Sequence, residues 1–278
     1  MFTRNTVLAR PGQRVFQLAV CVFVLSALLN LQPGPVRAGN VGGIIDTDTT
    51  WSLGGSPYIV TSPIWVLEGV TLTIEPGVTV RFDSHRAMQI DGELLALGTS
   101  GSPVTFTSNA AVPAPGDWDF ITFTNTSQDA LYDVSGNYVS GSTLQYVILE
   151  YGGGASVDNN GTLRLDAAAP YLLSSTLRHS ASGGLNGFNF TSDMTFKAAH
   201  NTIRDNAGTG IRVTGGGYVE ITDNVMINDV YSATSLGGGI RLDTTSNLIR
   251  GNLIRGNNSD WSGSGIQVLG GSSTIRDN

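Results

Sequence analysis

The C-terminal half of the chain repeats short patterns at a nearly constant spacing. A glycine followed by an aliphatic residue recurs in steps of 26, 29 and 26 residues, at Gly184, Gly210, Gly239 and Gly265. An Ile-x-x-Asn pattern recurs between these points, always in the same order. A unit of about 27 residues with three short apolar segments cannot bury its own apolar face, so successive units must stack. The repeat therefore indicates a solenoid.

Each unit has room for three short strands and for no helix. A strand can then pair only in parallel with its equivalent one coil away, about 4.8 Å along the stack. We predict an all-β parallel β-helix of three-strand coils, with roughly nine coils after residue 38. Because side chains alternate between the two sides of a strand, isoleucines should point inward and their neighbouring arginines outward. The inward set is Ile203, Ile211, Ile221, Ile240, Ile249 and Ile266, and the outward set is Arg204, Arg212, Arg241 and Arg250.

Asparagine recurs with the same period as the apolar residues. Its positions are Asn201, Asn224, Asn252 and Asn278. We expect these asparagines and the repeated glycines at the corners of the coils, in the left-handed backbone conformation that both residue types tolerate. Amide side chains stacked one coil apart can also bond to each other, so the asparagines are predicted to form a structural ladder.

The N-terminal residues follow the order of a secretory signal peptide. Three arginines and no acid occur in the first fourteen residues, and the apolar run Val15 to Leu31 follows. Val36 and Ala38 then supply the small-x-small ending that precedes cleavage. We predict a signal peptide over 1–38 and a secreted or cell-surface protein. An uncleaved anchor is the alternative, although the apolar run is short for a span of about 20 residues.

Charge and cysteine content exclude several classes of partner and cofactor. Removal of residues 1–38 leaves 11 basic residues (15 − 4) against 22 acidic ones and removes Cys21. An acidic chain does not suit nucleic acid, whose phosphates require a basic surface. Without cysteine the mature chain has neither disulfides nor thiolate metal sites. The three histidines are scattered without metal-ligand spacing, so no metal or other cofactor is predicted.

Several segments carry a resemblance to a known family. They include "NTIRDNAGTGIRV" from Asn201, "STLRHSASGGLNGF" from Ser175, "VTLTIEPGVTVRF" from Val70 and "DWDFITF" from Asp117. These segments resemble the right-handed parallel β-helix repeat proteins, the pectate-lyase-like superfamily in the broad sense, of the bacterial secreted or surface type. The resemblance covers about residues 40–278 and implies right-handed coils. It is specific for architecture and says almost nothing of activity.

We divide the chain into the signal peptide (1–38), an N-terminal cap with the first coils (39–110) and further β-helix coils (111–278). A solenoid end exposes backbone and core, so Trp51, Tyr58 and Trp65 are expected to cover it. Trp118 is expected to pack on a coil. The last residues match only the first strand of a coil. We therefore expect the chain to be truncated at its C-terminus and to associate end to end through the open coil.

A column of arginines is the candidate binding surface. Arg164, Arg212 and Arg241 occupy equivalent positions on their strands, and Asn186 and Gln267 fall in the same column. Asp166 follows Arg164 by two residues, and Asp243 follows Arg241 by two residues. Guanidinium groups suit carboxylated or hydroxylated sugars. The alternative is a solvated face with cross-coil Arg and Asp pairs, each worth at most about 1 kcal/mol. The candidate glycan-binding residues are Arg164, Asp166, Arg212, Arg241 and Asp243.

The function predicted from these features is that of an exported, non-catalytic β-helix protein used for adhesion or glycan binding. Its partner would be a polysaccharide or a cell-surface glycan, and the mature chain would have no membrane span. No catalytic residue is predicted. The alternative is a polysaccharide lyase or glycoside hydrolase on the same scaffold, which would need two or three acids within about 5 to 10 Å of each other.

Overall fold

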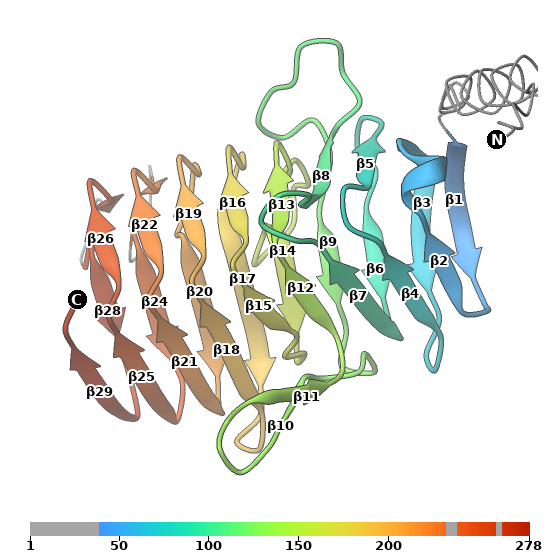
Figure 1. The fold of residues 1–278 in the computed structure, drawn as a ribbon. Helices are drawn as coiled ribbons and strands as arrows, with labels where there is room; N and C mark the ends of the chain where they lie inside the picture. The colour runs from blue at the N-terminus through green and yellow to red at the C-terminus, as the bar shows by residue number, and fades with distance from the viewer. Residues whose placement is uncertain (1–38, 232–237, 260–262) are drawn as a thin grey trace, which may run out of the picture. The chain divides into compact units, whose positions relative to one another are not determined.

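The computed structural model describes residues 39–231, 238–259 and 263–278. The predicted signal peptide lies outside these ranges. The described residues form a parallel β-solenoid of about eight turns with a coil spacing of about 26 residues, which confirms the predicted fold class. Within these residues the one helical segment is the 3-10 turn η1 (Leu53–Gly55). Figure 1 shows equivalent strands of successive coils side by side along the stack.

Each coil contributes one strand to each of three faces. The first face contains β5 (Thr79–Phe82), β8 (Val104–Ser108), β13 (Val147–Glu150), β16 (Thr176–Arg178), β19 (Thr202–Arg204), β22 (Val225–Ile227) and β26 (Leu253–Arg255). The second face contains β6 (Met88–Ile90), β9 (Ile121–Phe123), β14 (Gly161–Asp166), β17 (Gly183–Phe190), β20 (Ile211–Gly215), β24 (Ile240–Asp243) and β28 (Ile266–Val268). The third face contains β2 (Thr49–Trp51), β4 (Thr71–Ile74), β7 (Glu93–Leu97), β12 (Thr143–Gln145), β15 (Tyr171–Leu173), β18 (Thr195–Ala199), β21 (Tyr218–Thr222), β25 (Ser246–Arg250) and β29 (Ser272–Arg276).

The remaining strands join or decorate the three faces. The long strand β3 (Tyr58–Val66) pairs with β5 through its first half and with β6 through its second half, so it connects the first two faces. Strand β1 (Gly39–Ile45) pairs with β3. An antiparallel hairpin is made by β10 (Leu131–Tyr132) and β11 (Tyr138–Ser140), and β23 (Val230–Tyr231) pairs in parallel with β27 (Asn258–Ser259).

Like residues stack on like residues inside the coils. Ile211, Ile240 and Ile266 follow each other in register on the second face. Five of the six predicted inward isoleucines are fully buried, and Ile266 is partly buried and packs against the same core. The four predicted outward arginines are partly exposed. Burial of each such aliphatic side chain contributes roughly 1.5 to 3 kcal/mol, so the stacked core is the main source of stability.

The asparagine ladder is confirmed, but its backbone geometry differs from the prediction. Nδ2 of Asn201 donates to Oδ1 of Asn224 at 2.9 Å, and Nδ2 of Asn224 donates to Oδ1 of Asn252 at 3.0 Å. The ladder asparagines themselves lie outside the left-handed region. That conformation belongs to the residue just before each of them, such as His200 and Asp223. The corner bends at that residue, and the following amide N–H is then satisfied by the asparagine of the next coil.

Insertions between coils explain why about eight turns are found where roughly nine were predicted. The connection from β9 to β12 carries the β10–β11 hairpin, which stands off the stack in Figure 1. Lys197 holds this hairpin: its Nζ donates to Gly136 O at 3.0 Å and lies 4.4 Å from the centre of the Tyr132 ring. The same ammonium forms an ion pair with Glu220 at 3.2 Å.

The aromatic residues predicted to cap the first coil divide into two groups. Trp51 is buried and stacks on Tyr58 with ring centres 4.8 Å apart, as a cap requires. Trp65 is 43% exposed and pairs in register with Gln89 on the outer surface of the second face, so its placement in the cap was wrong. The alternation of β3 turns Ile64 and Val66 inward and leaves Trp65 outside. Trp118 is fully buried and stacks on Phe82, which confirms that it packs on a coil.

Candidate functional site: a polar groove on the second face

A continuous column of polar side chains runs along the outside of the second face. The strand register places the predicted Arg164, Arg212 and Arg241 in this column. Asn186 lies between Arg164 and Arg212, and Gln267 follows Arg241, as the sequence predicted. The column begins with residues that the repeat did not reveal, because two insertions interrupt the period before Arg164. Its members in order are Gln89, Thr122, Arg164, Asn186, Arg212, Arg241 and Gln267.

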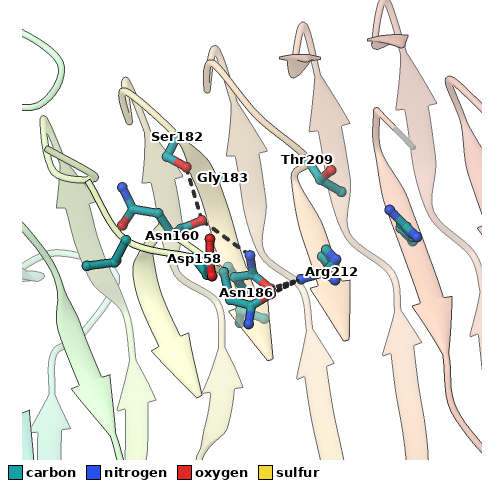
Figure 2. A pocket seen from close by; sticks show the side chains of 11 residues that line it. Asp158, Asn160, Ser182, Gly183, Asn186, Thr209 and Arg212 are labelled. Atoms are coloured by element: carbon teal, nitrogen blue, oxygen red, sulfur yellow. Dashed lines mark hydrogen bonds between the residues drawn. The ribbon is translucent and has the colours of Figure 1, made fainter. Parts of the chain in front are cut away.

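A groove of about 290 Å³ opens over part of this column (Figure 2). One wall is the loop that precedes β14, and the floor is made by residues at the starts of β17, β20 and β24. Its polar lining residues are Asp158, Asn159, Asn160, Ser182, Asn186, Thr209, Arg212 and Arg241. A wider hollow of about 790 Å³ shares Asp158, Asn160 and Ser182 and extends to Pro115. The polar surface therefore continues from the groove around the corner between the first and second faces.

The loop before β14 is held against the coils by its own asparagines. The carbonyl oxygen of Asn160 accepts hydrogen bonds from Ser182 Oγ at 3.0 Å and from Asn186 Nδ2 at 3.3 Å. Its side-chain Nδ2 donates to Gly153 O at 2.8 Å and to Ala155 O at 2.6 Å. The wall of the groove is thus tied to the next coil and to its own turn.

Arg212 is positioned by two amide oxygens. Its Nη1 donates to Asn159 Oδ1 at 2.6 Å and to Asn186 Oδ1 at 2.9 Å. Figure 2 shows Arg212 and Asn186 reaching toward each other from neighbouring strands. Both of these acceptors are uncharged amide oxygens.

Arg164 lies beneath the same loop and holds it. Its Nε and Nη2 donate to the carbonyl oxygens of Asn159 and Asp158, at 3.2 and 3.4 Å. The guanidinium carbon lies 4.6 Å from the centre of the Phe120 ring and 5.2 Å from that of Phe188. Burial lowers the pKa of Arg164 from its ordinary value, and the nearby Asp166 carboxylate opposes that shift. Arg164 therefore supports the groove wall and is not among the residues that line the groove.

The two predicted acids lie apart from the groove and from each other. Asp166 accepts a hydrogen bond from Asn189 Nδ2 at 2.7 Å, and it pairs in register with Phe188. Asp243 pairs with Thr214. Phe188 and Thr214 stand between the two acids, so the acids are separated by three strand spacings, about 14 Å. Of the five predicted binding residues, the groove brings together Arg212 and Arg241.

Sequence reasoning missed the loop residues Asp158, Asn159 and Asn160 and the corner residues Ser182 and Thr209. A signal was present, because a polar residue directly precedes a glycine at or just before the start of a second-face strand, at Asn160-Gly161, Ser182-Gly183 and Thr209-Gly210. Within the described ranges no three His, Cys, Asp or Glu side chains gather in a way that could hold a metal ion. No helix in those ranges has the length and apolar character needed to cross a membrane.

A second hollow, of about 420 Å³, lies between the β10–β11 hairpin and the third face. Its walls include Tyr132, Lys197, Asp129 and Asp193. Burial raises the pKa of Asp129 from its ordinary value, and the negative charge of Asp193 adds to that rise. The Lys197 ammonium contacts the Tyr132 ring, Gly136 O and the Glu220 carboxylate. We therefore assign its charge the structural role of holding the hairpin.

Comparisons with known proteins agree with this architecture. Residues 43–166 match the family described as a pectate-lyase like beta helix domain, and residues 121–278 match the family described as a right handed beta helix region. The chain is 41% identical over 69 residues to "Protein bark beetle" of Drosophila melanogaster, which is 25% of this chain and spans 2% of the length of that relative. No solved structure matches. Because the second family match covers more than half of the chain, the chain belongs to the family of right-handed parallel β-helix proteins.

Proposed function

We propose that this chain is the coil region of an exported, non-catalytic β-helix protein that binds an extended glycan along its second face. The observation that carries this proposal is the continuous outer column from Gln89 to Gln267. Its members recur at the inter-strand distance of about 4.8 Å. Where the column lines the groove, at Asn186, Arg212 and Arg241, a linear ligand parallel to the stack axis would meet one hydrogen-bonding side chain per coil.

The chemistry of the groove favours an acidic glycan. Arg212 and Arg241 present guanidinium groups, whose planar fork matches a carboxylate. The neighbouring amides and hydroxyls, from Asn160, Asn186 and Thr209, can both donate to and accept from sugar hydroxyls. Without residues 1–38 the chain carries 11 basic against 22 acidic residues, and this excess of negative charge repels polyanions at long range. Binding of a uronate chain would therefore depend on the local arginines and not on overall charge.

The alternative of cleavage has weaker support in the groove. Glycoside hydrolases use two carboxyl groups about 5 to 9.5 Å apart. Among the described residues that line the groove, Asp158 is the acid. We therefore favour binding over turnover, and the release of cleaved ends becomes an outcome of the test.

Export is proposed on the N-terminal pattern alone. The basic start, the apolar run and the small-x-small ending at Ala38 support a signal peptide. A secreted or cell-surface protein would meet polysaccharides there. Mass spectrometry of the protein recovered from the medium or surface of producing cells tests this step, and an N-terminus other than Gly39 would argue against cleavage after Ala38.

The binding test compares oligouronates with neutral oligosaccharides of equal length by calorimetry. Arg212→Gln and Arg241→Gln should each weaken oligouronate binding about tenfold or more, since each removes a charge-assisted hydrogen bond. Arg81→Gln is the matched control, because Arg81 is an exposed arginine on the first face. Equal loss in the control, or no binding of any glycan, would contradict the proposal. Release of unsaturated or reducing ends would favour the enzyme.

A further inference from the structure

A second ladder runs beside the asparagine ladder, one corner further along each coil. Its members are Ser180, Asn206, Asp229 and Asn257. The main-chain N–H of each donates to the side-chain oxygen of the next: Ser180 to Asn206 at 3.0 Å, Asn206 to Asp229 at 3.1 Å and Asp229 to Asn257 at 2.8 Å. One member of this ladder is an acid in a place that its neighbours fill with an amide.

The Asp229 carboxyl group is fully buried, and its two oxygens have different surroundings. Oδ1 accepts from the main-chain N–H of Asn206 and from Asn206 Nδ2, the latter at 2.9 Å. Oδ2 is buried and accepts no hydrogen bond. A buried carboxylate oxygen without a partner is costly, since nothing replaces the water that it has lost.

The neighbouring coils show what this second atom should face. Asn206 Nδ2 donates to Leu177 O at 3.2 Å, and Asn257 Nδ2 donates to Met226 O at 3.1 Å. Ile203 stands between Leu177 and Met226 in register. The equivalent partner of Asp229 Oδ2 is therefore the carbonyl oxygen of Ile203. A carbonyl oxygen only accepts, so the ladder is complete when Oδ2 carries a proton and donates it.

We propose that Asp229 is a neutral carboxylic acid in the folded chain and that its proton locks the second ladder at this coil. Ionisation would place a negative charge beside the carbonyl oxygen of Ile203. The Asp229 Oδ2 atom also lies close to Gly210, since a Cβ atom added there would be 2.7 Å from Oδ2. The proton therefore controls how tightly β19 and β22 are held together. This inference is independent of the proposed glycan binding.

Burial and a neighbouring negative charge both favour the neutral form of Asp229. Burial raises the pKa of Asp229 to about 7, the hydrogen bonds from Asn206 oppose that rise, and the negative charge of Asp205 adds to it. Asp205 is the corner residue one coil earlier. It forms an ion pair with Arg204, and the nearby His179 helps to lower the pKa of Asp205. In the following coil the corner residues Gly256 and Asn257 are uncharged.

The sign of the pH dependence follows from the shift. The folded chain holds a proton that the unfolded chain releases above the ordinary value of 3.8. The stabilisation is therefore fully present below that value and is lost as the pH rises toward about 7. Asp129 also has a raised pKa and contributes in the same direction. A comparison of variants is needed to isolate Asp229.

The experiment measures the thermal midpoint of the chain from pH 5 to pH 9 with and without Asp229→Asn. Asparagine supplies the missing donor at every pH, so the margin by which the variant exceeds the wild type should grow by about 5 °C between pH 5 and pH 8. Asp223→Asn is the control: Asp223 is a half-exposed corner acid of the same coil, in a left-handed conformation that asparagine tolerates. The control should keep the wild-type pH dependence.

Infrared spectroscopy of the wild type at pH 5 gives a second readout that needs no stable variant. A band from a neutral buried carboxyl group should be present and should disappear with a midpoint near neutral pH. Absence of that band, or a difference between wild type and Asp229→Asn that does not change with pH, would overturn the proposal.

Discussion

Arg212 donates from Nη1 to Oδ1 of Asn159 at 2.6 Å, across 53 residues of sequence. This bond joins the loop before β14 to a strand two coils further along the stack. It is the contact that turns a row of outward side chains into a groove with a wall. The loop before β14 and the Arg212 side chain therefore position each other.

Asn159→Gly tests this contact without straining the backbone. Asn159 has φ +51, a left-handed value that glycine adopts readily. The variant should lower oligouronate affinity about tenfold, since Arg212 loses a positioning acceptor, while unfolding free energy falls by less than about 1 kcal/mol. Calorimetry and denaturant unfolding measure the two effects. Asn159→Ala adds a backbone cost of roughly 1 to 2 kcal/mol and should destabilise more.

Arg164→Gln should act on stability before it acts on binding. It removes donors to Asp158 and Asn159 carbonyls and the cation–π contacts with Phe120 and Phe188. The expected loss is about 2 to 3 kcal/mol of unfolding free energy, with faster protease cleavage in residues 153–160. Arg81→Gln serves as the exposed control. A loss of glycan affinity with unchanged stability would place Arg164 in the binding surface instead.

Asn224→Ala should be strongly destabilising. Asn224 is buried, donates to Ala198 O, Thr222 O and Asn252 Oδ1, and accepts from Asn201. Alanine leaves several buried polar groups unpaired, at about 1 to 3 kcal/mol each. Denaturant unfolding should show a loss of about 3 kcal/mol or more. A loss below about 1 kcal/mol would mean that water replaces the ladder contacts.

Asn224→Asp should place a buried, neutral carboxylic acid in the asparagine ladder, as Asp229 is proposed to do in the second ladder. A buried acid there would have a raised pKa, so the variant should be most stable at low pH and lose stability as the pH rises through the folded-state pKa. Thermal midpoints from pH 5 to pH 9 measure this. A loss that is the same at every pH would show that the first ladder does not accept a neutral acid.

Lys197→Met should loosen the β10–β11 hairpin while leaving the coils intact. It removes the donor to Gly136 O, the ion pair with Glu220 and the cation over the Tyr132 ring. Hydrogen exchange should accelerate in residues 131–140 and stay unchanged in β19 and β22. Because Lys197 is the only lysine of the chain, slow acylation of the peptide that contains it, read by mass spectrometry in the wild type, is a second measure. Rapid acylation would mean that the ammonium is not held.

The regular part of the structure was predictable because its interactions are local or reach exactly one coil. Ile211 and Ile240 lie inside because side chains alternate along a strand, and Asn201 meets Asn224 because the repeat returns the chain to the same corner. Asp229 follows Asn224 by five residues, as Asn206 follows Asn201. That spacing was visible in the sequence, but its significance depends on burial at a second corner.

The sequence by itself determined the solenoid, the direction of its side chains and the order of the outer arginine column. Tertiary structure alone decided that the loop 157–160 folds over Arg164 and Arg212, that Asp166 and Asp243 remain apart, and that Trp65 faces outward. The physical reason is that stacking obeys one hydrogen-bonding distance and one period, whereas an insertion has no period. Its position is set by whichever side chains of the underlying coils satisfy its backbone.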